Sequence, residues 1–388
     1  MNNFTFHNPT KIYFGRGQIA KLDEAVPQEG TTLLLYGGGS IKRNGVYEQV
    51  RAALGSRDVV EFGGVEPNPT YETLMEAVAL ARREDAAFLL SVGGGSVLDG
   101  TKFVAAAVPL DGEPWDILTG ARKPERAVPL GAVLTLPATG SEANANAVVS
   151  RRSTQEKLGF SSRHVYPRFS VLDPETTFSL PERQVANGIA DAFVHVMEQY
   201  MTYPAGAPLQ DRLAESILQT LVEVAPKTLA EPANYEHRAT FMWSATMALN
   251  GLIGLGVPQD WATHGIGHEL TALYGIDHAR TLAVVLPALL AEQREGKRDK
   301  LLQYGARVWG LTEGDEDARI DGAVEKTAAF FESLGIPSRL AAYAEASPDT
   351  PALVADRLAA RGAVPLGERR DLSAERVRRI LARSMEAA

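Results

Sequence analysis

The sequence of 388 residues predicts a two-domain protein in which an α/β domain precedes an all-α domain. Up to about residue 180, short apolar segments of strand length alternate with helical patterns, which is typical of a parallel sheet covered on both faces. Beyond that point the strand patterns stop and amphipathic helical patterns continue to the end. The chain is also longer than one ordinary core can fill. We therefore expect domains over residues 1–180 and 181–388.

Strands and helices alternate in the first domain. Residues 31–36 (TTLLLY) are almost continuously apolar and end at a glycine cluster, which predicts a strand buried on both faces. Pro67 and Pro69 prevent an early helix start, and the Thr70 hydroxyl can cap the helix that follows. Strands are expected at residues 11–14, 31–36, 59–62 and 87–92 and before Pro137, helices near Gln18, over 45–54 and 71–83 and from Val97, and a hairpin or sheet extension over 156–172.

Helices account for the second domain. Apolar residues recur at helical spacing, and Gly335 and Pro337 mark a clear interruption between two of the helices. The expected helices cover residues 187–200, 211–223, 238–250, 282–292, 299–309, 320–334, 351–360 and 373–384, with a further helix around His264.

Composition excludes several classes of function. The net charge of −9 and the lack of a basic run argue against nucleic acid as a partner. No apolar run approaches the ~20 residues that a membrane helix needs, and the N-terminus has neither the basic nor the apolar part of a signal peptide. We therefore expect a cytoplasmic protein. The absence of cysteine excludes disulfides, cysteine nucleophiles, iron–sulfur clusters and cysteine-type zinc sites.

The motif GGGS occurs twice, at residues 37–40 and 93–96, each time after a predicted strand. Glycines allow close approach of a ligand, and the N-terminus of the following helix offers N–H groups to an anion, so a Rossmann-like site for a phosphate-bearing cofactor is indicated. The strict dinucleotide fingerprint is absent, because Lys42 and Leu98 replace its third glycine. Ordinary strand–helix turns are the alternative interpretation.

The residues after the first GGGS favour NADP over NAD. An NAD site usually has an acid that binds the ribose 2′-hydroxyl. Residues 36–46 contain no acid but include Ser40, Lys42 and Arg43, which suit a 2′-phosphate. Residues 134–142 (LTLPATGSE) add hydroxyls that could contact the cofactor or merely form a turn, and Lys157 is a possible phosphate partner.

Acidic and imidazole side chains suggest a metal site. Asp191 and His195 are four residues apart and so lie on one face of a helix. The segment HGIGHELTALYGIDH adds three histidines, and four of the five residues would form an N3O site for Zn²⁺ or Fe²⁺. A metalloprotease HExxH motif is absent, because Gly265 follows the first histidine. A structural ion pair is the alternative for Asp191 and His195.

Several motifs together resemble the iron-dependent (group III) alcohol dehydrogenase family. They are GGGSVLDGTK, LTLPATGSE, the Asp191–His195 helix and HGIGHEL followed by DHA, and the likeness extends over essentially the whole chain. The sequence is most similar to the branch of NADPH-dependent broad-range aldehyde reductases and butanol dehydrogenases. The resemblance implies the two-domain fold of that family, shared with dehydroquinate synthase, and a homodimer.

The resemblance also implies roles for individual residues. The metal ligands correspond to Asp191, His195, His264 and His278, and His268 lines the site as a candidate proton relay. Ala279 departs from the glycine that much of the family has after the last ligand. The implied cofactor-binding residues are Gly38, Gly39, Ser40, Asn68, Gly94, Gly95, Ser96, Asp99, Thr135, Thr139, Ser141 and Lys157.

The expected function is hydride transfer between NADP(H) and short-chain alcohols or aldehydes, mainly as aldehyde reduction. One divalent metal, Fe²⁺ or Zn²⁺, would polarise the substrate oxygen. Three alternatives remain: a polyol dehydrogenase of the glycerol type, a lyase such as dehydroquinate synthase, and a non-catalytic nucleotide-binding protein with core histidines.

Overall fold

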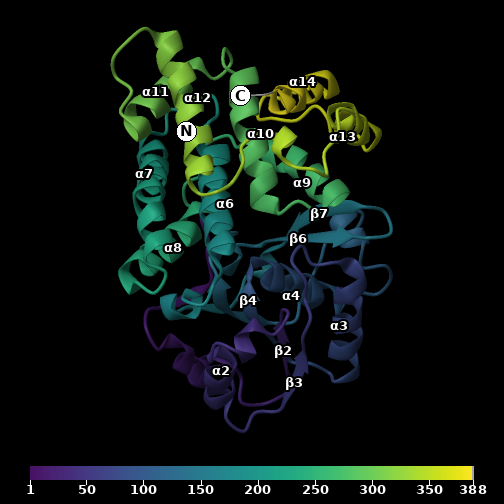
Figure 1. The fold of residues 1–388 in the computed structure, drawn as a ribbon. Helices are drawn as coiled ribbons and strands as arrows, with labels where there is room; N and C mark the ends of the chain where they lie inside the picture. The colour runs from purple at the N-terminus through teal and green to yellow at the C-terminus, as the bar shows by residue number, and fades with distance from the viewer. Residues whose placement is uncertain (387–388) are drawn as a thin grey trace. The chain divides into compact units, whose positions relative to one another are not determined.

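The computed structural model describes residues 1–386. The chain divides into two compact units, which Figure 1 traces by residue number. The α/β unit comprises His7–Val185 and Ala230–Asn250, and the helical unit comprises Met1–Phe6, Ala186–Leu229 and the chain from Gly251 onward. Each unit thus includes segments from both halves of the sequence. The division at residue 180 stays a prediction.

A six-stranded parallel sheet forms the centre of the α/β unit, in the order β1-β8-β5-β4-β2-β3. Its strands are β1 (Lys11–Phe14), β2 (Thr32–Tyr36), β3 (Val59–Phe62), β4 (Phe88–Gly94), β5 (Leu130–Leu136) and β8 (Phe169–Leu172). Strands β2 and β4 are direct neighbours, so the two GGGS segments that follow them emerge at the same edge of the sheet.

The predicted hairpin or sheet extension over residues 156–172 is divided between two sheets. Strand β7 (Glu156–Ser161) pairs with β6 (Asn146–Arg151) as an antiparallel hairpin, whereas β8 joins the main sheet between β1 and β5. Both readings of this segment are therefore partly right.

Hydrophobic clusters cover the two faces of the sheet because successive strand residues point to opposite sides. Leu33 packs in the cluster of α3 (Tyr71–Arg83) and α4 (Gly95–Ala107), and the next residue, Leu34, packs in the cluster of α2 (Val46–Leu54). The Thr70 hydroxyl accepts a hydrogen bond from the Thr73 N–H, which confirms its predicted capping role. The helices of this unit are α1 (Leu22–Ala25), α2 (Val46–Leu54), α3 (Tyr71–Arg83), α4 (Gly95–Ala107), α5 (Asp116–Thr119) and α8 (Tyr235–Ala248).

Helix α8 lies late in the chain but belongs to the α/β unit. Its Met242 packs against Leu134 and Leu172 of the sheet. Its Thr246 hydroxyl donates to Oε1 of the buried Glu142 at 2.5 Å. Sheet packing therefore determines where this helix lies.

The helical unit contains the other long helices. Most of α6 (Glu182–Tyr200), from Ala186 onward, lies in this unit. Its Phe193 packs against the rings of Phe330 and Phe331 with centroid distances of 5.0 and 5.6 Å. The helices are α6 (Glu182–Tyr200), α7 (Pro208–Ala230), α9 (Ala262–Tyr274), α10 (His278–Glu292), α11 (Arg298–Trp309), α12 (Glu316–Ser333), α13 (Thr350–Ala360) and α14 (Ala374–Met385).

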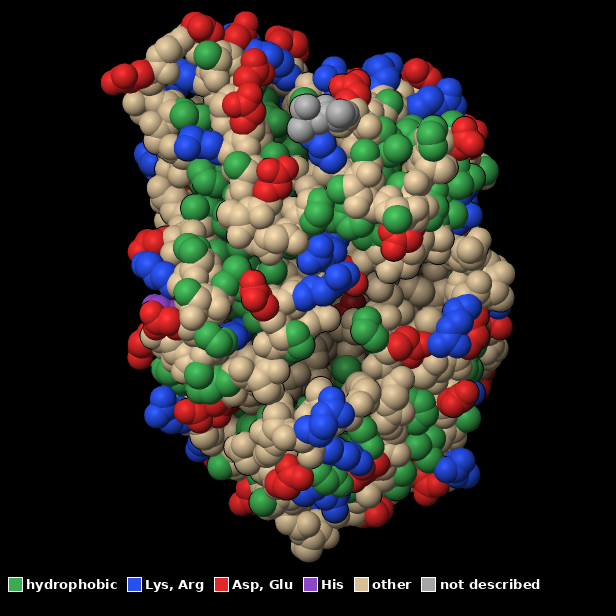
Figure 2. Space-filling view, in the orientation of Figure 1, with side chains coloured by type: hydrophobic (Ala, Val, Ile, Leu, Met, Phe, Trp, Pro, Cys, Tyr) green, Lys and Arg blue, Asp and Glu red, His purple; other side chains and the backbone are tan. Residues whose placement is uncertain are grey.

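On the molecular face shown in Figure 2, Lys and Arg side chains are interspersed with Asp and Glu. Among residues 1–386, no helix combines the length and the apolar composition that crossing a bilayer requires.

Candidate metal centre

Helix α6 places the first two predicted ligands in the interior of the helical unit. Asp191 and His195 are one turn apart, and their exposed fractions are only 3% and 5%. The neighbouring apolar side chains are completely buried: Ile189, Ala192, Phe193, Val196 and Met197. A buried carboxylate requires a compensating partner, because its desolvation is costly.

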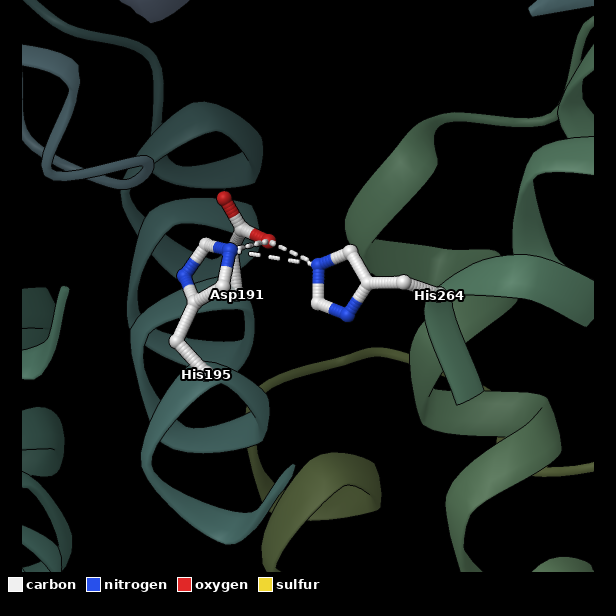
Figure 3. A group of neighbouring side chains, drawn as sticks. All are labelled: Asp191, His195 and His264. Atoms are coloured by element: carbon white, nitrogen blue, oxygen red, sulfur yellow. Dashed lines mark hydrogen bonds and ion pairs between the residues drawn. The ribbon is translucent and has the colours of Figure 1, made fainter. Parts of the chain in front are cut away.

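Three imidazoles approach one oxygen of that carboxylate. The Nε2 atoms of His195 and His264 lie 3.7 and 4.0 Å from Oδ1 of Asp191 and 3.1 Å from each other (Figure 3). His278, the first residue of α10, places its Nε2 3.9 Å from the same oxygen. All four predicted ligands are therefore brought together within the helical unit.

This donor set fits a divalent cation. Oδ1 of Asp191 is buried and has no hydrogen-bond partner among the described residues. Ligand atoms around a tetrahedral metal with bonds of about 2.0–2.1 Å are about 3.3 Å apart. The 3.1 Å between the Nε2 atoms of His195 and His264 is close to that value, and the distances of 3.7–4.0 Å from the three imidazoles to Oδ1 of Asp191 are somewhat longer. Three imidazole nitrogens and one carboxylate oxygen suit Zn²⁺ or Fe²⁺.

His268 lies beside this group, one turn after His264 on α9. Its ring centroid is 5.0 Å from that of His278 and 5.9 Å from that of His264. The residues whose ligand atoms form the tight group are Asp191, His195 and His264. The position of His268 is thus compatible with lining the site.

Two further residues of α6 contact the ligand-bearing helices and were missed in the sequence. Glu198 accepts a hydrogen bond from the His264 backbone N–H at 3.0 Å and also contacts Nδ1 of that imidazole. Asn187 donates to Oδ2 of Asp277, directly before His278, at 2.8 Å. Both residues lie three or four positions from Asp191 or His195 on the same helix, and this spacing could have identified them in the sequence.

The surroundings of Glu198 shift the pKa of its carboxyl group upward. Burial and the negative charge of Asp260 raise the pKa of the Glu198 carboxyl well above its usual range, whereas the His264 N–H and His195 lower it. Glu198 is therefore a second carboxyl group beside the candidate metal position.

In the α/β unit, the loop after β2 leaves room for a ligand. Gly39 adopts a left-handed conformation with φ of 82° at the start of the short 3₁₀ turn η2 (Ser40–Lys42). A Cβ atom added at Gly38 or Gly39 would meet nothing within 4 Å. These glycines are consistent with close approach of a cofactor.

The glycines after β4 are required by close packing against neighbouring side chains. A Cβ at Gly95 would lie 2.4 Å from Oγ1 of Thr139, and one at Gly94 would lie 3.0 Å from Cβ of Leu136. The close packing of this turn against the end of β5 therefore requires glycine. Helix α4 begins at Gly95 without a side-chain cap, so its N-terminus suits an anion.

Three predicted cofactor-binding residues form one hydrogen-bonded set. Lys157 Nζ donates to Oδ1 of Asn68 at 2.8 Å, and the Asn68 N–H donates to Oγ of Ser96 at 3.3 Å. Asn68 has a positive φ of 54°, which is uncommon outside glycine. The set connects the helix α4 turn to the β6–β7 hairpin.

Asp99 and Ser141 have internal partners instead. The Ser141 hydroxyl donates to Oδ1 of Asp99 at 2.6 Å, and the Val148 N–H donates to Oδ2 at 3.0 Å. Burial raises the pKa of Asp99. Thr135 is buried on β5. Asp99 thus holds the loop after β5 in position, and cofactor binding by Asp99 and Ser141 stays a prediction.

The Lys42 ammonium group already has an acidic partner within the protein. Its Nζ lies 3.3 Å from Oε2 of Glu61 and 4.7 Å from the ring centroids of Tyr36 and Tyr47. Arg43 is exposed. Arg43 is therefore the more available cation for a cofactor phosphate.

Comparison with known proteins decides the family. Residues 9–174 match the model of the iron-containing alcohol dehydrogenases, and residues 185–385 match the C-terminal model of the same family. The chain belongs to the iron-containing alcohol dehydrogenase family. This confirms the predicted resemblance and makes the chain an oxidoreductase.

Individual relatives of this alcohol dehydrogenase agree in sequence and fold. It is 58% identical over 383 residues to the NADPH-dependent aldehyde reductase YqhD of Escherichia coli, covering 98% of this chain and 99% of that protein. It is 42% identical to a probable NADH-dependent butanol dehydrogenase of Bacillus subtilis, covering 99% and 100%.

Solved structures of relatives confirm the predicted fold class. The E. coli YqhD crystal structure matches with a TM-score of 0.97 and 56% identity over 99% of both chains. The NADH-dependent butanol dehydrogenase A of Thermotoga maritima matches with a TM-score of 0.95 and 37% identity, over 100% of this chain and 99% of that one.

We expect Asp191→Asn to remove the stabilisation that metal gives without destabilising the metal-free protein. The substitution keeps the shape but replaces a buried carboxylate by a weaker, neutral ligand. At a metal concentration of 100 Kd, binding should stabilise the parent by about 2.7 kcal/mol. Thermal unfolding followed by circular dichroism, in chelator and in excess Zn²⁺, measures both effects.

The matched control is His237→Asn, which changes a histidine of the α/β unit. It should retain the full metal-dependent rise in Tm. An equal rise in Asp191→Asn would contradict the assigned ligand.

Proposed function

We propose that this chain is a metal-dependent oxidoreductase that transfers hydride between NADP(H) and short-chain alcohols or aldehydes, mainly reducing aldehydes with NADPH. The observation that carries the proposal is the approach of three imidazole Nε2 atoms to one buried oxygen of Asp191, at 3.7–4.0 Å. The E. coli relative, named an NADPH-dependent aldehyde reductase, supports the reaction direction.

The four ligands would hold one Fe²⁺ or Zn²⁺ ion, and their chemistry accepts either. A metal bound there supplies Lewis acidity at the substrate oxygen, and NADPH supplies the hydride. His268, 5.0 Å from His278 between ring centroids, is the proposed proton donor to that oxygen, directly or through water.

The glycine loops are proposed to bind the cofactor. Open space at Gly38 and Gly39 and the uncapped start of α4 support binding of phosphate groups. Preference for NADPH is supported by the lack of an acid at Gly39 and by the exposed Arg43. The B. subtilis relative is named NADH-dependent, so these loops are where the preference must be tested.

Activity with butanal tests the proposal directly. We expect NADPH to be oxidised faster than NADH with butanal, and NADP⁺ to be reduced only slowly with glycerol. Chelation should abolish the reaction, and added Fe²⁺ or Zn²⁺ should restore it. Full activity of metal-stripped His264→Ala would refute the metal role, and faster use of NADH would refute the cofactor preference.

Gly39→Asp tests the position that selects the cofactor. The new carboxylate would repel a 2′-phosphate, so we expect KM for NADPH to rise at least about tenfold and KM for NADH to change little. Gly120→Asp is the control, because Gly120 has a similar φ of 77° and open space around its Cβ position. Equal effects on both cofactors would contradict the assignment.

A homodimer completes the proposal. Met1, Phe4 and Phe6 are 55%, 50% and 52% exposed, and their apolar surface is suited to a subunit interface. Light scattering coupled to gel filtration should give twice the mass of 41.8 kDa. A single-chain mass at micromolar concentration would contradict the dimer.

A further inference from the structure

Four polar residues lie on one face of helix α6. Asn187, Asp191, His195 and Glu198 are separated by four, four and three residues, which places them in one row along the helix. Asp191 and His195 are the proposed ligands. The carboxyl of Glu198 extends beyond them towards α9, with only 3% of the residue exposed.

Glu198 accepts a hydrogen bond from a backbone N–H group in the first turn of α9. His264 is the third residue of α9, so its backbone N–H has no partner within the helix. Oε1 of Glu198 accepts that N–H at 3.0 Å. The same carboxyl contacts Nδ1 of His264 through Oε2. One side chain therefore fixes both the backbone and the imidazole of His264.

The imidazole orientation follows from these contacts. A neutral imidazole carries one N–H, and the nitrogen that binds a metal must present its lone pair instead. Nε2 of His264 faces Nε2 of His195 at 3.1 Å and Oδ1 of Asp191 at 4.0 Å. For Nε2 to bind a cation, the proton must reside on Nδ1, where only a hydrogen-bond acceptor is compatible.

We propose that Glu198 is a positioning residue of the metal centre, which holds the His264 proton on Nδ1 and presents the Nε2 lone pair to the metal. The inference rests on the metal site proposed above. A carboxylate behind a ligating histidine orients the ring and increases its basicity.

The fold holds the start of α9 by a second, independent contact. Oδ1 of Asp260 accepts the Ala262 N–H at 2.9 Å, and its Oδ2 accepts from Nζ of the buried Lys297 at 2.8 Å. Lys297 also donates to Oε2 of Glu368 at 3.1 Å. A change at Glu198 should therefore leave α9 in place and affect mainly the His264 ring.

Glu198→Gln tests the inference with Co²⁺ as the probe. The amide can offer its oxygen to only one of the two His264 donors, and its NH₂ group favours the wrong tautomer. We expect the Kd for Co²⁺, measured from the visible absorption of the bound ion, to rise about 10–100-fold.

The matched control is Glu215→Gln. Glu215 is also a buried carboxylate of the helical unit, and it accepts from the Tyr200 hydroxyl and from Arg307 at 2.9 and 2.8 Å. It should retain the parental Kd for Co²⁺. Glu198→Asp keeps the carboxylate but is one C–C bond shorter, so its Kd should fall between those of the parent and Glu198→Gln.

A spectroscopic readout separates positioning from a merely structural role. In the Co²⁺ protein, the exchangeable Nδ1 proton of His264 should give a strongly shifted proton NMR signal that exchanges slowly, because Glu198 accepts it. Glu198→Gln should lose or rapidly exchange this signal, whereas Glu215→Gln should retain it.

The inference is overturned if folded Glu198→Gln keeps the parental Kd for Co²⁺ and the same set of shifted N–H signals. If that variant does not fold, Glu198→Asp decides the question, and a parental Kd there overturns it equally. A parent protein that binds no Co²⁺ refutes the proposed metal centre itself, and the inference with it.

Discussion

The buried charge of Asp191 is the constraint on which the helical unit depends. Its Oδ1 has no hydrogen-bond partner among the described residues, yet three imidazole nitrogens lie 3.7–4.0 Å away. Leaving an ionised carboxylate uncompensated in an apolar interior costs several kcal/mol. The metal ion proposed for these four groups would offset that cost. The apolar packing around α6 leaves Asp191 only 3% exposed, which is why its carboxylate requires such a partner.

Helix α6 organises this candidate site because it carries two of the proposed ligands and also contacts the segments that carry the other two. Glu198 fixes the start of α9, which carries His264, and Asn187 contacts Asp277 at the start of α10, which carries His278. Helix α6 thus positions His264 and His278, which lie on separate helices, relative to Asp191 and His195. In the α/β unit, the parallel sheet has an equivalent effect, because adjacent strands β2 and β4 bring both glycine loops to one edge.

Much of the fold could be predicted from local patterns. The continuous apolar run of β2 and the Thr70 cap of α3 are properties of neighbouring residues, and the structure reproduces both. The assignment of α8 to the α/β unit could not be predicted, since it depends on Met242 packing against distant strands. The ion pair between Lys42 and Glu61 could not be predicted either, because Glu61 lies on another strand.

For the candidate site, the sequence by itself determined the ligand types and their local spacing, because Asp191 and His195 share a helix face through the helical period alone. Only the tertiary structure decided that His264 and His278 start separate helices and meet the same carboxylate oxygen. It also revealed Glu198, which contacts a residue 66 positions away. Helical periodicity is a local property of the chain, whereas the partner of a buried polar group is decided by how distant helices pack.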